Sequence, residues 1–343
     1  MADASGKRRI RLNLALQGGG SHGAFTWGVL DRLLAVENLE ITGISGTSAG
    51  AVNGTVMAWG LARSGPQAAR EDLARFWNRT SEVAAWSPLR PSFLDRLTSR
   101  GNMDLSPAWH WFDSLSRLLS PYQFNPAGLN PLAPLLKEVV DFEGLREKGT
   151  IPLFLAATNV RNGRIRVFER PEIRLESVLA STCLPRLFRA VQIYGEYYWD
   201  GGFMGNPPIY PLIYGTDCED VLIIQINPIN IPQVPTTPAE IEDRENELAF
   251  NSSLMREMRA IDFVTRLLDS QKIDRERYKR LNIHMIGAEE EMAPLSYSSK
   301  LNADREFLYW LFELGRGRAE TWIETHLDKV GETSSIDIAD MFL

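Results

Sequence analysis

Residues 39–62 read LEITGISGTSAGAVNGTVMAWGLA, a short apolar strand that passes through glycines into a helix of small residues. Inside this stretch, Gly46-Thr47-Ser48-Ala49-Gly50 matches the pattern G-x-S-x-G. A sharp turn between strand and helix, with small side chains on both sides, holds the serine hydroxyl clear at the carboxyl end of the strand. The amino terminus of the following helix favours the negative charge that develops when a serine attacks a carbonyl. The pattern therefore predicts Ser48 as a nucleophile, within a turn that Gly46 and Gly50 make possible.

A second glycine-rich turn lies upstream of the first. Residues 10–17 (IRLNLALQ) predict a strand, residues 24–35 (AFTWGVLDRLLA) predict a helix, and GGGSHG (18–23) joins them. The N–H groups of consecutive glycines, which no side chain shields, can converge on a developing oxyanion. Two adjacent strands that end in the glycine loop and in the serine turn place these donors beside the nucleophile. The expected oxyanion loop is Gly18, Gly19 and Gly20, and Gly23 completes the motif.

The same GGGSHG segment matches the G-x-G-x-x-G pattern of nucleotide-binding loops, but its surroundings argue against that function. A dinucleotide site would place an acidic residue at the end of the second strand to hold the ribose. Here the second strand ends in the serine turn instead. A phosphate-binding P-loop would continue with Gly-Lys-Ser or Gly-Lys-Thr, and this loop does not. The oxyanion interpretation is therefore favoured.

A serine nucleophile needs a proton acceptor, and Asp200-Gly201-Gly202 provides the candidate. The motif follows the aromatic run Tyr197-Tyr198-Trp199, so the aspartate ends a short strand and the glycines let it approach another loop closely. Loss of solvent would raise the pKa of Asp200 and make it a better base. Taken alone, Asp-Gly-Gly is also typical of an ordinary turn.

Together, GGGSHG (18–23), GTSAG (46–50) and DGG (200–202) resemble the patatin-like phospholipase family, whose motifs occur in this order. The segment LASTCLPRLFRAVQIYGEYYWDGG (179–202) is also similar to the family's approach to its aspartate. The resemblance covers residues 10–226 and extends towards 287. It implies a Ser48–Asp200 dyad without histidine, and hydrolysis of fatty acyl esters by a phospholipase A- or esterase-like enzyme. It implies no metal and no organic cofactor.

Two positions depart from the family pattern. Members often carry Asp before the glycine loop and Arg within it, whereas this chain has Gln17 and His22. The loss of a guanidinium removes a donor that could orient the loop. We expect His22 to do this work weakly or in a pH-dependent manner, which leaves the substrate preference open.

The remaining pattern predicts an α/β fold with a mostly parallel central sheet flanked by helices, which the resemblance relates to the α/β-hydrolases. Residues 151–160 and 221–228 are almost continuously apolar, as expected for strands covered on both faces. Between them, RIRVFE (164–169) and VQIYGEYYWD (191–200) predict a hairpin-like pair.

A helical part follows a proline-rich loop at 227–240. We expect an amphipathic helix over about 240–280, a strand over 283–287 and a helix over about 303–328. The expected domains are a hydrolase domain over 10–287 and a helical C-terminal extension over 288–343.

Residues 86–135 look different from the rest, because they combine seven prolines with aromatic residues such as Trp109, Trp111 and Tyr122. We interpret them as an irregular helical excursion over the sheet. Such a segment can form a satellite hydrophobic cluster, or a lid and lipid-contact surface.

The overall composition limits the partners of the chain. A formal net charge of −7 argues against nucleic acid, because phosphate binding needs clustered positive charge. The apolar run near the N-terminus is interrupted at Asn13 and is too short for a secretory segment. We expect a cytoplasmic protein, peripheral to a membrane, that binds a lipid or acyl-ester substrate. Cys183 and Cys218 are expected to be buried thiols, and no oligomeric state follows from the sequence.

Two other hypotheses stay open. The order Ser…Asp…His also permits a triad with His284 or His326, as in other serine esterases. Alternatively, the aromatic excursion and the amphipathic helix could bind a lipid or polymer surface with little turnover.

Overall fold

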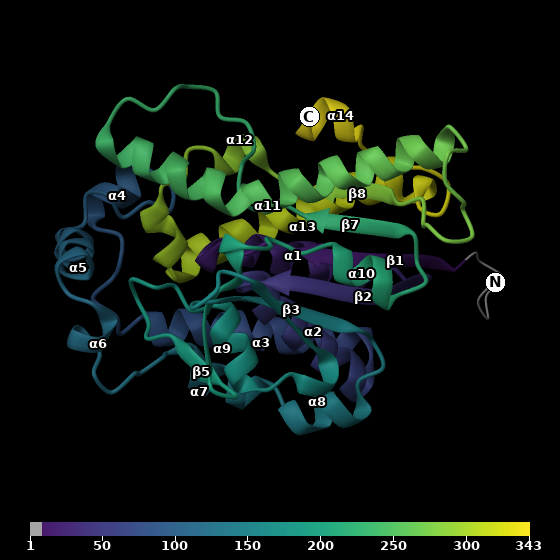
Figure 1. The fold of residues 1–343 in the computed structure, drawn as a ribbon. Helices are drawn as coiled ribbons and strands as arrows, with labels where there is room; N and C mark the ends of the chain where they lie inside the picture. The colour runs from purple at the N-terminus through teal and green to yellow at the C-terminus, as the bar shows by residue number, and fades with distance from the viewer. Residues whose placement is uncertain (1–8) are drawn as a thin grey trace.

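A computed structural model describes residues 9–343, and Figure 1 shows a central sheet with helices on both faces. The strands are β1 (Ile10–Leu16), β2 (Leu39–Thr47), β3 (Leu153–Asn159), β4 (Ile165–Glu169), β5 (Val191–Ile193), β6 (Glu196–Asp200), β7 (Asp220–Ile224) and β8 (Asn282–Ile286). Their order is β5-β6-β3-β2-β1-β7-β8, with β4 paired to β3. Strands β3, β2, β1, β7 and β8 are parallel, whereas β4 and β6 are antiparallel to β3. The predicted α/β fold with a mostly parallel sheet is confirmed.

Helices connect the strands and cover the sheet. Those of the first half are α1 (Gly23–Leu33), α2 (Ala49–Ser64), α3 (Pro66–Ala84), α4 (Phe93–Thr98), α5 (Pro107–Leu118), α6 (Pro121–Phe124), α7 (Leu132–Val139) and α8 (Phe142–Lys148). Those of the second half are α9 (Leu175–Ser181), α10 (Tyr210–Gly215), α11 (Pro238–Asp269), α12 (Glu289–Met292), α13 (Arg305–His326) and α14 (Ile338–Phe342). Short 3-10 turns are η1 (Gly20–His22), η2 (Arg170–Glu172), η3 (Gly201–Phe203), η4 (Tyr297–Leu301) and η5 (Leu327–Lys329). Within the described residues, none of the helices has both the length and the apolar character that crossing a membrane requires.

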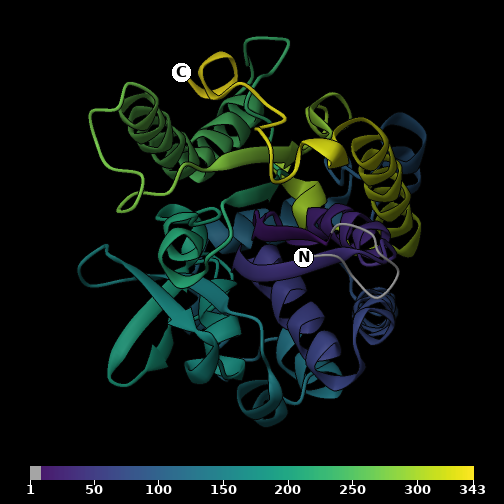
Figure 2. The same cartoon turned by 90° about the vertical axis from the view of Figure 1, so that its right-hand side faces the viewer.

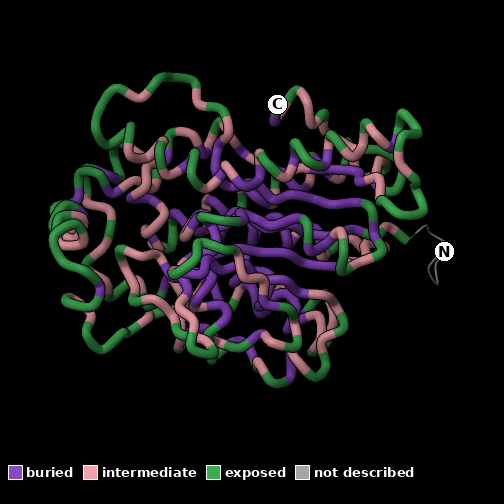
Figure 3. Tube along the Cα trace, in the orientation of Figure 1, coloured by how far each residue is buried: buried purple, intermediate pink, exposed green. Residues whose placement is uncertain are grey.

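The central strands of the sheet are buried on both faces, and most of their residues are apolar. In β1, Leu14 and its alternate neighbours join a hydrophobic cluster with α1, α2 and α13, whereas Ala15 points into a second cluster. Helices α10 and α11 close the second cluster, through side chains such as Leu212 and Met258. Figures 1 and 2 place α11 on the opposite side of the sheet from α2 and α3, and Figure 3 shows the strands buried between these layers. Continuous rather than alternating apolar character is what two covered faces require.

Helix α13 packs along α1 at a distance that only glycine permits. A Cβ on Gly28 of α1 would collide with the backbone oxygen of Phe312, and a Cβ on Gly315 of α13 would collide with that of Phe25. The rings of Trp27 and Phe312 lie beside this contact, with centroids 4.0 Å apart. The C-terminal helix is therefore packed against the first helix of the chain. The domain boundary at 287 stays a prediction.

One predicted strand pairing is wrong. The hairpin-like pair expected from 164–169 and 191–200 does not form: β4 pairs with β3, and β5 and β6 make a hairpin of their own. The link from β3 to β4 is a tight turn, in which Gly163 has a φ of 68° and donates its N–H to the Asn159 oxygen at 2.9 Å. So short a turn favours pairing between neighbours along the chain.

Two further expectations differ in detail from the structure. Helix α11 ends at Asp269 rather than near 280, because the chain turns at Gln271 with a φ of 56°. Residues 86–135 form α4, α5, α6 and the start of α7, and Figure 1 shows the first three of these helices beyond the carboxyl ends of the parallel strands, not over a face of the sheet. The strand and helix expected over 283–287 and 303–328 are confirmed as β8 and α13, and Cys183 and Cys218 are buried thiols.

Gly315 and Gly317 of α13 provide a matched test of the helix packing. A Cβ at Gly315 meets the Phe25 oxygen, whereas a Cβ at Gly317 meets nothing within 4 Å. We expect Gly315→Ala to lower the free energy of unfolding by about 1–3 kcal/mol through overpacking. Gly317→Ala should raise it by up to about 1 kcal/mol, because alanine favours a helix interior. Urea unfolding followed by circular dichroism measures both, and equal effects would contradict the close approach of α1 and α13.

Candidate active site

The register of β3 brings Ser48 and Asp200 together. The last residue of β2, Thr47, pairs with Ala156 of β3, and the next residue, Ala157, pairs with Asp200 at the end of β6. Strand β4 pairs with one edge of β3, so β6 pairs with the same edge as β2, at the residues of β3 that follow the end of the β2 pairing. Strands β2 and β6 therefore lie along the same edge of β3 in opposite directions, with their carboxyl ends facing each other. Ser48, which follows Thr47, and Asp200 lie where they meet.

Ser48 occupies a strained turn between β2 and α2. Its φ of 54° and ψ of −122° form a conformation that residues other than glycine rarely adopt. Gly50 makes the turn sterically possible, because any Cβ there would collide with the backbone oxygen of Leu16 in β1. The N–H of Ser48 donates to Ser181 Oγ at 3.0 Å. The strand, turn and helix predicted around Ser48 are confirmed.

Asp200 is completely buried at the end of β6. Its Oδ1 accepts from the Gly202 N–H at 2.8 Å, whereas its Oδ2 has no hydrogen-bond partner among the described residues. Burial raises the pKa of this carboxyl to about 7, and the Gly202 N–H and the Ser48 hydroxyl act in the opposite direction. The Ser48 hydroxyl is thus close enough to stabilise the carboxylate electrostatically, but the contact lacks the geometry of a completed hydrogen bond.

The glycine loop lies directly against the serine. A Cβ on Gly18 would stand 2.6 Å from Ser48 Cβ, so a larger residue does not fit there. The N–H of Gly18 donates to Asn206 Oδ1 at 2.7 Å and is not free for a substrate oxygen. The N–H groups of Gly19 and Gly20 have no acceptor within residues 9–343, and both glycines line a cavity together with Ser48. Of the three expected donors in this loop, the N–H of Gly18 is therefore engaged, and those of Gly19 and Gly20 remain the candidates.

Gln17 and His22, the two departures from the family pattern, make internal contacts. Gln17 Oε1 accepts from the N–H groups of Ile226 and Asn227, at 2.8 and 2.9 Å. His22 Nε2 lies 2.7 Å from Ser299 Oγ. Burial, with a smaller contribution from the nearby Lys300, lowers the pKa of His22 to about 3. His22 is therefore neutral at ordinary pH, and the expectation that it orients the loop in a pH-dependent manner is wrong.

Three polar side chains that the motifs did not reveal hold the glycine loop. Asn206 accepts from the Gly18 N–H, and Asn227 Nδ2 donates to the Gly18 oxygen at 2.8 Å. Lys300 Nζ donates to Asn227 Oδ1 at 2.9 Å from η4, in the C-terminal part of the chain. The one pointer in the sequence was the closeness of Asn206 to the Asp-Gly-Gly motif, because Asn227 and Lys300 belong to no motif.

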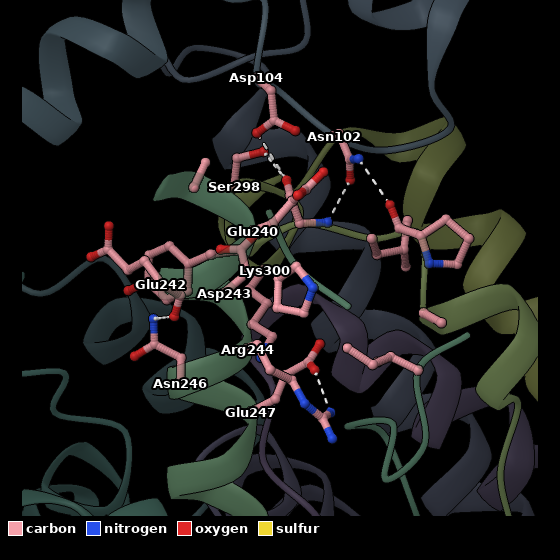
Figure 4. A pocket seen from close by; sticks show the side chains of 18 of the residues that line it. Asn102, Asp104, Glu240, Glu242, Asp243, Arg244, Asn246, Glu247, Ser298 and Lys300 are labelled. Carbon is pink, nitrogen blue, oxygen red and sulfur yellow. Dashed lines mark hydrogen bonds and ion pairs between the residues drawn. The ribbon is translucent and has the colours of Figure 1, made fainter. Parts of the chain in front are cut away.

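A cavity of about 1550 Å³ opens above Ser48, Gly19 and Gly20. Helix α5 contributes Trp109 to its wall, and the loop 230–237 and the start of α11 form another wall. Figure 4 shows the charged and polar side chains that line it near Lys300. A space of this size exceeds the usual range of small-ligand pockets, about 300–1,000 Å³, and suits a long flexible substrate. Within residues 9–343, no group of His, Cys, Asp and Glu has an arrangement that could hold a metal ion.

Comparison with known families gives one match. A family model described as patatin-like phospholipase matches residues 14–213, which include the glycine loop, Ser48 and Asp200. The chain belongs to the patatin-like phospholipase family. Membership in it supports lipid acyl hydrolysis as the general activity, with a lipid as substrate. Among curated proteins, none matches the chain.

Three solved structures are similar to the chain at low sequence identity. VipD from Legionella pneumophila is 16% identical, with 95% of this chain and 70% of VipD covered at a TM-score of 0.46. A chain of the heterodimeric ExoU–SpcU complex from the type III secretion system of Pseudomonas aeruginosa is 19% identical. The match covers 72% of this chain and 51% of the chain in the complex, at a TM-score of 0.31. The type III effector protein ExoU gives 16%, coverages of 90% and 53%, and a TM-score of 0.29. The chain spans about half the length of the matched chain in each of the last two structures.

Within the described residues, no histidine of this patatin-like protein hydrogen-bonds to Ser48 or Asp200. His284 is buried in β8, where its Nε2 lies 3.1 Å from Asp220 Oδ1. Strand β8 is three strands from β2 in the sheet order, roughly 14 Å at about 4.8 Å per strand. His326, at the end of α13, contacts Thr325 Oγ1 at 2.6 Å. The geometry does not support a triad with either residue.

The buried carboxyl of Asp200 makes the stability of the patatin-like fold depend on pH. Its folded-state pKa of about 7 lies above the ordinary value of 3.8, so the folded chain keeps this proton over a range where the unfolded chain has lost it. The quantity of interest is the free energy of unfolding of the wild-type chain compared with that of Asp200→Asn. The stabilisation by the protonated carboxyl is fully present below about pH 4. It falls by at most about 1.4 kcal/mol per pH unit as the pH rises to 7. Urea unfolding of both proteins across this range measures the difference. Parallel pH profiles would contradict the raised pKa.

Proposed function

We propose that the chain is a phospholipase A- or esterase-like lipid acyl hydrolase in which Ser48 is the nucleophile and Asp200 its proton acceptor. The observation that carries this proposal is the unpartnered Oδ2 of Asp200, buried beside the Ser48 hydroxyl. A buried carboxylate oxygen without a donor is costly, and such atoms concentrate where chemistry uses them. A rotation of the Ser48 side chain would supply the missing donor.

Burial makes Asp200 suited to its proposed role. A general base works best when its pKa lies near the working pH, and desolvation brings the pKa of Asp200 to about 7. An exposed aspartate, with a pKa near 4, would hold the serine proton far more weakly. Asp200 therefore needs no histidine between it and Ser48.

The proposed reaction has two halves. Ser48 Oγ attacks the ester carbonyl carbon while Asp200 takes the hydroxyl proton, and the N–H groups of Gly19, Gly20 and Ala49 stabilise the oxyanion. The tetrahedral intermediate collapses, the alcohol leaves with the proton held by Asp200, and an acyl-serine remains. A water molecule that gives its proton to Asp200 then attacks the acyl-serine. The fatty acid is released, and the proton returns to Ser48.

Removal of either proposed catalytic group tests this mechanism. Ser48→Ala should abolish fatty acid release from p-nitrophenyl esters and from phospholipids, because the nucleophile is lost. Asp200→Asn should lower kcat by about 10²–10⁴, because an amide cannot accept the proton. Ser64→Ala, at the exposed end of α2, is a matched control and should not change the rate. A fluorophosphonate probe should label Ser48, and a folded protein without an adduct would favour the rival hypothesis of lipid binding without turnover.

The glycine loop gives an independent test of the oxyanion donors. A Cβ on Gly19 would lie 2.6 Å from Ile226 Cγ2, so Gly19→Ala must displace the loop N–H groups. We expect kcat to fall by about 10²–10³ with little change in KM, because these donors act mainly in the transition state. Steady-state kinetics with a soluble p-nitrophenyl ester measures this, with Gly317→Ala as the control. An unchanged kcat would rule out Gly19 and its neighbour as the oxyanion site.

A further inference from the structure

Residues 86–129, which comprise α4, α5, α6 and their linking loops and are called the cap below, concentrate exposed hydrophobic side chains. Ten of the 22 large hydrophobic side chains that are exposed within residues 9–343 lie in the cap. The most exposed of them are Trp86 (91%), Leu118 (81%), Phe93 (75%), Leu129 (72%), Leu97 (68%) and Trp111 (68%). Figure 3 shows this end of the molecule as a largely exposed lobe. Apolar groups rarely gather on a surface in such number without a partner.

Helix α5 connects this surface to the cavity above Ser48. Its buried Trp109 faces inward, with a ring centroid 6.2 Å from that of Tyr297, and lines the cavity together with Asp113. Trp111 and Leu118 are seven residues apart and lie on the opposite face, because an α-helix repeats every 3.6 residues. One helix therefore has one side in the cavity and the other in solvent. A ligand bound at the cap surface is next to the cavity wall.

The charge of the cap allows contact with phospholipid headgroups. The cap contains four arginines and three aspartates, a net charge of +1, whereas the whole chain has −7. Asp95 is buried and accepts from the N–H groups of Ser92 and Leu105, both at 2.7 Å, and Asp113 is paired with Arg117 at 2.8 Å. Most of the negative charge of the cap is therefore engaged internally, and Arg96 and Arg117 are themselves paired with Asp304 and Glu242 outside the cap. The cap is thus close to electrically neutral and does not repel a phosphate layer.

We propose that the cap docks on a phospholipid bilayer, with Trp111 and Leu118 among the side chains that enter the interface, so that a lipid ester passes into the cavity without crossing water. The inference rests on the proposed function for the identity of the lipid as substrate. Tryptophan is typical of membrane–water interfaces, because its ring is apolar and its N–H is polar. The exposed groups are spread over three short helices and their loops, which a fluid bilayer can match and a rigid protein groove cannot. A second copy of the chain is the competing occupant.

Vesicle binding tests the cap separately from catalysis. The full chain carrying Ser48→Ala should co-sediment with phosphatidylcholine vesicles. Adding Trp111→Ser and Leu118→Ser should lower its partition onto the vesicles by at least about 10-fold, because the inserted apolar area is lost. The matched control replaces Tyr214 (85% exposed, in α10) and Phe263 (63% exposed, in α11) by serine and should leave the partition unchanged.

A rate comparison with Ser48 intact tests whether docking serves hydrolysis. The cap double substitution should lower the rate on phosphatidylcholine vesicles about 10-fold more than the rate on a soluble short-chain p-nitrophenyl ester, by the same loss of partition. Circular dichroism shows whether each variant is folded. An equal loss on both substrates would mean that the cap serves the chemistry and not the docking.

The outcomes separate this inference from the proposed function. The docking proposal is wrong if the wild-type chain does not bind vesicles. It is also wrong if the control double substitution lowers vesicle binding as much as the cap double substitution does. Vesicle binding without any ester hydrolysis overturns the proposed function and leaves docking in place. If the cap substitutions abolish self-association in light scattering while vesicle partition is unchanged, the surface binds a second copy and the docking proposal is wrong.

Discussion

The head-on meeting of β2 and β6 along one edge of β3 is the constraint on which the site depends. Two hydrogen bonds fix the end of β6 there. Thr158 Oγ1 donates to the backbone carbonyl oxygen of Asp200 at 2.8 Å, and the backbone N–H of Asp200 donates to the carbonyl oxygen of Cys183 at 2.8 Å. A slip of one residue in this register would turn the Asp200 side chain to the opposite face of the sheet. The short antiparallel part of a mostly parallel sheet therefore positions a carboxylate that no local motif could place.

Strain and burial at the site are held in place by the packing around it. Ser48 keeps an unfavourable backbone conformation because Gly50 lets α2 lie against β1, and Asp200 keeps an unpaired oxygen away from water. Residues in such states persist only where their surroundings determine them fully. The same desolvation that costs stability at neutral pH raises the pKa of Asp200 into the range of a useful base.

The C-terminal part of the chain completes the glycine loop, although it lies outside the family match at 14–213. Ser299 Oγ shares a hydrogen bond with His22 Nε2. Lys300 donates a hydrogen bond to Asn227, which in turn donates one to the backbone oxygen of Gly18. The loop is thus oriented by hydrogen bonds from distant segments, and not by a charged side chain within the loop itself. Helix α13, whose Gly315 lies against α1, fixes the helix that follows this loop.

Local features could be predicted from the residues alone: the strand–turn–helix around Ser48, the glycine loop and the strands that are covered on both faces. These are predictable because backbone sterics and hydrophobic periodicity act over a few residues. Three other features follow from packing between distant segments. Residues 164–169 pair with β3, Asn206 accepts from the N–H of Gly18, and burial lowers the pKa of His22 while it raises that of Asp200. Pairing edges, long-range hydrogen bonds and desolvation depend on neighbours in space, which are set only when distant segments have packed together.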